Sequence, residues 1–194
     1  MPVSSLSSYS AINHQVVNIN KNNKRSEFRD RNQNGQIQIY QSSYRGSYSS
    51  IIRDSLRNAA LGRKVLLVQL MKGGVKQGIV NAQKLCGNLT WIRSSNSYDQ
   101  YESDDISNDT NLAKDINNSI TELWDFCKKE LLSGEYDQII LDEVFLAIEM
   151  NIISKDDLIS TLENRFISGD VILTGTSIPK NFILMADQIT ELRS

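Results

Sequence analysis

The sequence is short of the residues that define several classes of protein. It has 194 residues but only two cysteines and one histidine. Two thiols cannot build the disulfide framework of a small secreted domain, so a reducing compartment is favoured. Cys86 and Cys127 both lie in an apolar-periodic context, which predicts buried, unreactive thiols. His14 has no visible partner, and a lone histidine in a polar segment is more often incidental than a ligand or a base.

Long apolar runs and an excess of positive charge are also missing. No run approaches the roughly 20 apolar residues that a membrane-spanning helix needs, and the N-terminus has no hydrophobic signal-peptide core. The sequence therefore predicts a cytoplasmic protein without a membrane partner. Its formal net charge of −2 argues against general nucleic-acid binding, which normally needs a surplus of Lys and Arg.

Two segments are too polar to build a core. Residues 1–35 are rich in Ser, Asn and Gln, and between Lys21 and Arg31 five basic residues face only Glu27 and Asp30. This composition predicts a flexible N-terminal segment, which either contacts a phosphate or an acidic protein partner or is a solvated tail. Residues 94–110 are acidic and contain no Lys or Arg after Arg93. They lack the glycine and regular spacing of a calcium loop, so an acidic surface insertion is favoured over a cation site.

The rest of the chain alternates between strand and helix patterns. The runs KVLLVQL (64–70), DQIILD (137–142) and DVILTG (170–175) are continuously apolar and end in polar or small residues, which is typical of parallel strands buried on both faces. Helical patterns precede them, with apolar stripes over 51–60 and 112–131 and a third stripe formed by Leu158, Ile159, Leu162 and Phe166 after a Ser154 cap. Gly62, Gly134 and Gly169 fall where these helices should end. We therefore expect one α/β domain over residues 36–194, with a mainly parallel sheet flanked by helices.

In such a fold, ligands bind beyond the carboxyl ends of the strands. Four segments should meet there: the loop 41–49, QLMKGG (69–74), LDE (141–143) and TGTSIP (174–179). QIILDE resembles a Walker B strand, whose terminal carboxylate, here Asp142, holds magnesium in nucleotide-hydrolysing enzymes. The alternative is that Asp142 caps the next helix.

The stretch IQIYQSSYRGSYSS (37–50) occupies the place of a phosphate-binding P-loop. A functional loop reads G-x-x-x-x-G-K-[ST], with backbone amides and a lysine around the phosphates and a hydroxyl on magnesium. Aligned on Gly46, this chain has Gln41 in place of the first glycine, Ser47 in place of the lysine and Tyr48 in place of Ser/Thr. The lost ammonium contact is worth about 1.5–3 kcal/mol, or one to two decades in affinity. Catalysis through this loop is therefore not expected.

Most of the chain resembles a known family, the ATP:corrinoid adenosyltransferases. The resemblance is strongest in YDQIILDEVFLAIEMNIISKDDLISTLENRFISGDVILTGTSIPKNFILMADQITELR (136–193) and in ALGRKVLLVQLMKGG (60–74), which is similar to the strand that ends V-Q-F-x-K-G. LTW (89–91) is similar to an F-T-W stretch near the corrinoid. The resemblance implies a RecA-like P-loop NTPase fold, transfer of adenosyl from Mg-ATP to reduced corrinoid cobalt, and a homodimer.

Carried over position by position, the resemblance assigns roles to individual residues. Asp142 and Glu143 would be catalytic, with Asp142 holding magnesium when nucleotide binds, and Leu89 and Trp91 would lie near the corrinoid. The family loop T-G-x-G-K-G-K-T-T appears here as QSSYRGSYS (41–49), with an arginine at its first lysine. The nucleotide-binding positions would be Ser42, Ser43, Arg45, Gly46, Ser47, Ser49, Lys72 and Gly73.

Two hypotheses follow for the function. In the first, the protein keeps the family fold but has lost ATP-dependent catalysis and acts as a binding or regulatory module. In the second, it is an active ATP:cob(I)alamin adenosyltransferase of cobalamin biosynthesis or salvage, in which Arg45, Ser49 and backbone amides replace the missing groups. The altered loop favours the first hypothesis.

Overall fold

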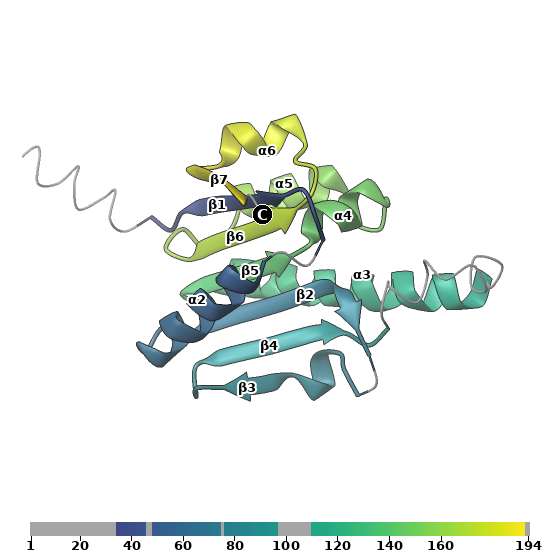
Figure 1. The fold of residues 1–194 in the computed structure, drawn as a ribbon, viewed down its shortest axis with the longest axis horizontal. Coiled ribbons are helices and arrows are strands. Elements are labelled where there is room, and N and C mark those ends of the chain that lie inside the picture. Colours follow the sequence, from purple (N-terminus) through teal and green to yellow (C-terminus); the bar gives the residue numbers. More distant parts are fainter. Residues whose placement is uncertain (1–33, 46–47, 75, 97–109, 193–194) are drawn as a thin grey trace, which may run out of the picture. The chain divides into compact units, whose positions relative to one another are not determined.

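A computed structural model describes residues 34–45, 48–74, 76–96 and 110–192, which belong to one compact unit, Gln33–Ser194. Most of the N-terminal segment, most of the acidic insertion, and Gly46 and Ser47 of the loop lie outside these residues. A seven-stranded sheet in the order β3-β4-β2-β5-β6-β1-β7 forms the centre of the unit (Figure 1). Among the described strands only the β3–β4 pair is antiparallel, which confirms the α/β fold with a mainly parallel sheet. The strands are β1 (Ile37–Ser42), β2 (Val65–Gly73), β3 (Gln83–Leu85), β4 (Leu89–Ser94), β5 (Gln138–Asp142), β6 (Asp170–Gly175) and β7 (Gln188–Leu192).

Helices cover both faces of the sheet. The helices are α2 (Ser49–Ala60), η1 (Ile79–Asn81), α3 (Thr110–Ser133), α4 (Val144–Glu149), α5 (Lys155–Glu163) and α6 (Lys180–Met185). Residues of α3, α4, α5 and α6 pack with Leu66, Val68, Ile139 and Leu141 in one core cluster. Residues of α2 pack with Val65, Leu67, Ile140 and Ile172 in a second cluster on the other face. No helix in the described ranges combines the length and the apolar character needed to cross a bilayer.

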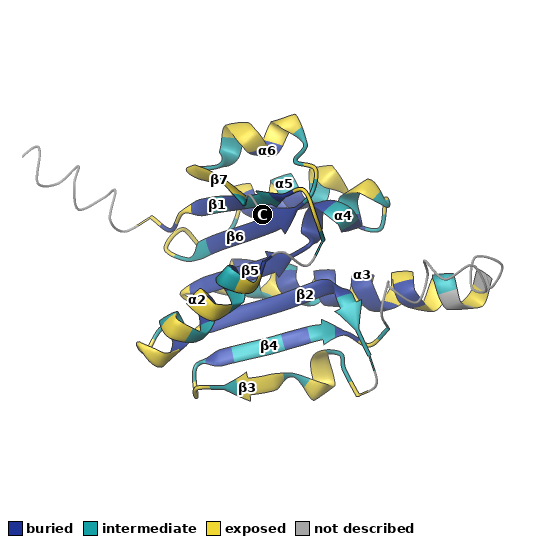
Figure 2. Ribbon diagram, in the orientation of Figure 1, coloured by how far each residue is buried: buried dark blue, intermediate teal, exposed yellow. Residues whose placement is uncertain are grey.

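The three continuous apolar runs form the centre of the sheet, as their composition predicts. Strands β2, β5 and β6 are buried along nearly their whole length, shown dark blue in Figure 2. Successive side chains of a strand point to opposite faces, so a strand covered by helices on both sides needs apolar residues at every position. Because side chains alternate between the two faces, every second residue of a strand lies on the face that carries α2.

Local signals set the helix ends in most places. The Ser154 hydroxyl accepts a hydrogen bond from the backbone N–H of Asp157 (3.4 Å), which confirms the cap of α5. Gly62 and Gly134 follow α2 and α3 with φ of +96° and +74°, a conformation that costs glycine little. The expectation that the third helix ends at Gly169 is wrong, because α5 already ends at Glu163. Phe166 is consequently 48% exposed and lies against Gly134 rather than on a helical face.

The two cysteines differ in environment. Cys127 is fully buried on α3, as predicted, and burial raises the pKa of its thiol well above the usual range. Cys86 is exposed, so the prediction of a buried thiol is wrong there. It occupies the turn between β3 and β4 with φ of +51°. The neighbouring apolar residues belong to a short edge strand rather than to a core helix, and the turn points the thiol outward.

Candidate functional site

Four strand ends meet at one edge of the sheet. Gln69 on β2 is in register with Asp142 on β5, Leu141 on β5 with Leu173 on β6, and Gln41 on β1 with Gly175 on β6. The parallel arrangement therefore brings segments that are far apart in the sequence to the same edge. Gln69, Asp142 and Thr174 continue the alternation of Leu67, Ile140 and Ile172, which places them on the face that carries α2.

Asp142 is the centre of this arrangement. Its side chain is only 2% exposed and accepts hydrogen bonds from three other side chains. Its Oδ2 accepts from Gln69 Nε2 at 2.8 Å and from Lys72 Nζ at 3.2 Å, and its Oδ1 accepts from Thr174 Oγ1 at 2.9 Å. The alternative that Asp142 caps the following helix does not hold, because the N-cap of α4 is Glu143 and no side chain bonds there.

Glu143 is held in a conformation unusual for its residue type. Its φ of +61° and ψ of +28° are left-handed, which costs a non-glycine residue about 1–2 kcal/mol. Two contacts hold it: its N–H donates to Thr174 Oγ1 at 2.7 Å, and its carboxylate pairs with Arg45. Arg45 donates from Nε (3.2 Å) and Nη2 (3.4 Å) to the two carboxylate oxygens. The Glu143 side chain is 3% exposed, so this fork-shaped ion pair closes over a buried acid.

Tyr48 is buried at the same place. It is the residue just before α2, and it is 1% exposed. Its phenol has no hydrogen-bond partner of ordinary geometry within the described residues. Burial first, and then the negative charges of Asp142 and Glu143, raise its pKa from 10.0 to about 12, while the nearby backbone of Ser42 and Gly175 slightly opposes this. The ring packs in the cluster on the α2 side, and its phenol lies near the backbone of Ser42 at the end of β1 and of Gly175 at the end of β6, within electrostatic range of the two carboxylates.

The remaining predicted loop positions do not gather around a ligand site. Ser42 is buried, and its Oγ accepts a hydrogen bond from the N–H of Tyr44 (3.3 Å). Ser43 is exposed, and Ser49 is exposed at the first turn of α2. Gly46 and Ser47 are outside the described residues. Of the predicted nucleotide-binding side chains, the structure brings only Arg45 and Lys72 to the two carboxylates.

Two glycines allow the backbone to pass closely at this edge. A Cβ on Gly73 would lie 2.2 Å from the carbonyl oxygen of Asn96, so β2 can approach that segment only without a side chain. A Cβ on Gly175 would lie 2.6 Å from the Cβ of Phe145. Each glycine is the last residue of its strand, so the close approaches set where the following loops begin.

The two predicted corrinoid-side residues lie on β4 in different environments. Leu89 is 1% exposed and packs in the α2-side cluster, so its side chain is not available to a ligand in this conformation. Trp91 is half-buried, and its Nε1 donates to Gln69 Oε1 at 3.0 Å. Arg93 Nε donates to the same oxygen at 2.8 Å. Because Gln69 also donates to Asp142, a continuous chain of hydrogen bonds joins Trp91 and Arg93 to the central carboxylate.

Sequence reasoning placed Gln69 and Thr174 in segments expected at this edge but gave neither residue a role, and it missed Arg93. Thr174 follows a continuous apolar run directly, whereas Gln69 lies within one. For metal ions, no group of three His, Cys, Asp or Glu side chains within the described ranges is placed to hold one. An ion at Asp142 would therefore need ligands other than these side-chain types.

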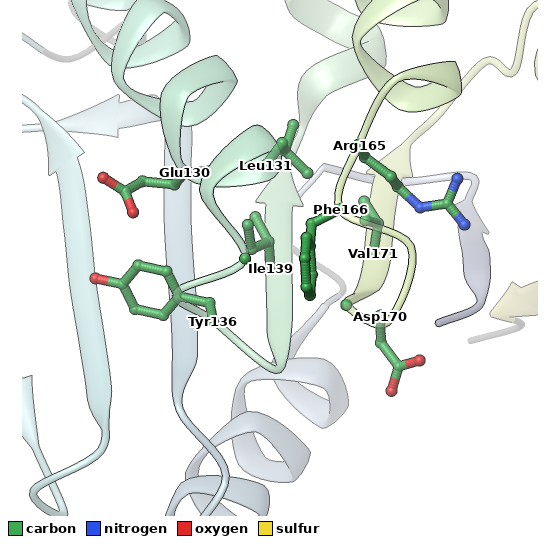
Figure 3. A pocket seen from close by; sticks show the side chains of 10 residues that line it. Glu130, Leu131, Tyr136, Ile139, Arg165, Phe166, Asp170 and Val171 are labelled. Atoms are coloured by element: carbon green, nitrogen blue, oxygen red, sulfur yellow. The ribbon is translucent and has the colours of Figure 1, made fainter. Parts of the chain in front are cut away.

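A small hollow lies away from this site, near the amino ends of β5 and β6, and it is too small for an organic ligand. Figure 3 shows Glu130, Tyr136, Arg165 and Phe166 around it, and its volume of about 10 Å³ leaves room for roughly one water molecule. Arg165 donates to the carbonyl oxygens of Leu162 and Gly35, each at 2.9 Å. Its Nε is buried without a partner in the described part of the chain, and burial lowers its pKa. This hollow is a packing feature.

The fold and the site together define a class of protein. A strand, loop and helix unit at β1–α2, an acidic strand end at β5, and strand β6 between them are the arrangement of the RecA-like, P-loop NTPase-like α/β proteins. Within that class, the chain belongs to the ATP:corrinoid adenosyltransferase family. The family model described as ATP:corrinoid adenosyltransferase BtuR/CobO/CobP matches residues 33–194. The resemblance stated from the sequence is thereby confirmed.

Individual relatives are distant. A corrinoid adenosyltransferase of Escherichia coli (strain K12) is 22% identical over 167 residues, which cover 82% of this chain and 76% of that protein. A corrinoid adenosyltransferase from a second Escherichia coli strain matches with the same figures. An uncharacterized protein of Nostoc sp., all2391, is 29% identical over 70 residues, which cover 36% of this chain and only 18% of that protein.

Proposed function

We propose that this protein is a corrinoid-binding member of its family that does not use Mg-ATP at the position of the P-loop, and that it acts as a binding or regulatory module. The observation that carries the proposal is the buried side chain of Tyr48. At the position where the family loop has a small hydroxyl residue, this chain has a buried aromatic ring whose phenol lies near the ends of β1 and β6, within electrostatic range of the carboxylates that would face the metal and nucleotide.

The first supporting argument is steric. A triphosphate and its magnesium ion need open, polar space above the carboxyl ends of the strands. Tyr48 occupies such space with a ring that is 1% exposed. Burial of a phenol without a partner of ordinary geometry among the described residues is unfavourable, and the side chain fills this place in the described conformation. The residues present therefore do not fit Mg-ATP.

The second supporting argument is electrostatic. Asp142 pairs with Lys72 and Glu143 pairs with Arg45, so two negative charges already face two positive charges. A bound triphosphate would have to draw these cations away from buried carboxylates. Breaking such pairs is costly because it leaves an uncompensated charge in a poorly solvated place. The loss of the loop lysine at position 47 removes the cation that would otherwise balance the phosphates.

The proposal is tested by titration calorimetry with Mg-ATP. Wild type should give no saturable heat, whereas Ser47→Lys combined with Tyr48→Thr should gain measurable affinity, because the change opens the space and adds a cation. Tyr44→Thr is the matched control, since Tyr44 is a loop tyrosine that is 64% exposed. Micromolar binding of Mg-ATP to the wild type would overturn the proposal.

The second candidate is an active ATP:cob(I)alamin adenosyltransferase, and one observation favours it. The guanidinium of Arg45 does reach the site, 3.2 Å from Glu143, so a cation is at hand although the loop lysine is not. In this case reduced cobalamin and ATP should yield adenosylcobalamin, and Asp142→Asn should abolish the yield. The absence of product under conditions in which the Escherichia coli relative is active would exclude this candidate.

The assembly and location are part of the same proposal. Family resemblance supports a homodimer, and the composition of the chain supports a cytoplasmic protein. The five basic residues between Lys21 and Arg31 support a contact of the N-terminal segment with an acidic protein partner. Sedimentation of the full chain, with and without residues 1–33, tests the dimer and the contribution of this segment to it.

A further inference from the structure

A hollow of about 160 Å³ lies next to the candidate site, on β3, β4 and the loop that precedes them. Its lining consists of Gln77, Gln83, Trp91 and Arg93. Trp91 and Arg93 are two positions apart on β4, so they point to the same face, and Gln83 is paired with Trp91 across the antiparallel ladder. Figure 2 shows β4 as a mixture of buried and partly exposed residues, in contrast to the uniformly buried β5.

Arg93 is held in place, but the described residues engage only one of its donor nitrogens. Its Nε donates to Gln69 Oε1 at 2.8 Å, and its guanidinium carbon lies 4.6 Å from the centre of the Trp91 ring. Its two terminal amino groups have no hydrogen bond or ion pair with any described residue. A guanidinium that is anchored at Nε and stacked on an aromatic ring loses little further freedom when it binds a ligand.

The chemistry of the hollow selects for an oxyanion. None of the described residues that line it is a carboxylate, and the nearby Asp142 already accepts hydrogen bonds from Gln69, Lys72 and Thr174. The amide groups of Gln77 and Gln83 add donors without adding negative charge. The fork of an arginine matches the two oxygens of a carboxylate or a phosphate, and such charge-assisted pairs are stronger than neutral hydrogen bonds. The volume suits one such group rather than a whole macrocycle.

We propose that Arg93, supported by Trp91 and Gln69, forms an oxyanion-recognising pocket that binds a carboxylate or phosphate group carried by the ligand on the β4 side of the site. This proposal rests on the proposed function for the identity of the ligand. The substrate class is then a corrinoid with an anionic peripheral group. Gln69 hydrogen-bonds both to Trp91 and Arg93 of this pocket and to Asp142.

The test compares corrinoids that differ only at the periphery. Calorimetry with the full chain measures the binding of a corrinoid whose side chains are carboxylates, of the same ring with the side chains amidated, and of a corrinoid that carries a phosphodiester. Wild type should prefer one of the anionic forms over the amide by about tenfold or more, the value of one charge-assisted contact. Arg93→Gln should remove the preference, while Arg93→Lys should keep part of it. Arg53→Gln is the control, since Arg53 is a largely exposed arginine on α2.

Each outcome decides something different. Equal binding of amide and anionic forms, unchanged by Arg93→Gln, would overturn the oxyanion pocket and leave corrinoid binding intact. A preference for the phosphodiester over the carboxylates would identify phosphate as the group. If none of the corrinoids binds, the proposed function fails, and titration with inorganic phosphate alone decides the pocket: Arg93-dependent saturation supports it, and its absence rejects it. Circular dichroism establishes whether each variant is folded. If Arg93→Gln does not fold, Arg93→Lys takes its place in the comparison.

Discussion

The replacement Tyr48→Phe removes a single oxygen atom from the middle of the candidate site. The ring stays in place, so packing between α2 and the sheet is unchanged. The phenol oxygen that disappears is buried and has no partner of ordinary geometry within the described residues. Burying an unpaired hydroxyl costs about 1–3 kcal/mol, so the variant should have a free energy of unfolding about 1–2 kcal/mol above that of the wild type. For a chain of this size that corresponds to an increase in Tm of about 2–8 °C.

The same variant has a distinctive alkaline signature. The pKa of Tyr48 is about 12 in the folded protein and 10.0 when the group is unperturbed. Between these values the unfolded chain loses the proton while the folded chain keeps it, so stability falls as the pH rises. Two pKa units correspond to roughly 2–3 kcal/mol, present in full below pH 10 and lost by about pH 12. Phenylalanine cannot ionise, so the stability difference between variant and wild type should widen across this window.

Urea unfolding followed by far-UV circular dichroism at pH 8 and at steps from pH 10 to 12 measures both effects. Tyr44→Phe is the matched control, because that tyrosine is 64% exposed and its removal should change neither quantity by more than about 0.5 kcal/mol. A less stable Tyr48→Phe protein, or one with the alkaline profile of the wild type, would mean that the phenol has a partner or is in contact with water. The conclusion that the phenol is buried without a partner would then be refuted.

Two further replacements test the structure around the site and the packing of the helices. Gly175→Ala should lower the free energy of unfolding by about 1–3 kcal/mol in thermal melts, because its methyl group would lie 2.6 Å from the Cβ of Phe145; a neutral result would mean that the loop moves freely. Burial opposes ionisation of Asp157, but hydrogen bonds from Trp124 and Lys128 outweigh it and lower the pKa. The contribution of Asp157 is present above its unperturbed pKa of 3.8 and is lost as the pH falls through the lower folded value, so Asp157→Asn should weaken the acid dependence of stability in this range. An unchanged acid transition would contradict this assignment.

The strands could be predicted because their burial leaves a direct mark on the sequence. A strand covered on both faces must be apolar at consecutive positions, and the three runs at 64–70, 137–142 and 170–175 have this property. The N-cap at Ser154 was equally local, since the cap and its partner are three residues apart. Where the signal was ambiguous, prediction failed. Cys86 and Phe166 lie in apolar surroundings, but a turn and an early helix end place both side chains at the surface.

The candidate site was only partly predictable. Asp142 was found because it ends a strand, and the altered loop was found because its motif positions are consecutive. The burial of Tyr48, the pairing of Arg45 with Glu143, and the joint contact of Trp91 and Arg93 with Gln69 were not found. These pairs are separated by many residues, and only strand order and register bring them together.

By itself, the sequence determined the α/β class, the positions of the central strands and the loss of the loop lysine, because hydrophobic periodicity and motif spacing act over a few neighbouring residues. The tertiary structure decided that the tyrosine beside that loop points inward and that both carboxylates have cations of the same chain as partners. It also decided that one arginine on β4 lines a hollow with donors that no described residue engages. These features depend on which strands are neighbours and which face each side chain takes. Neither property can be read from residues that are adjacent in the chain.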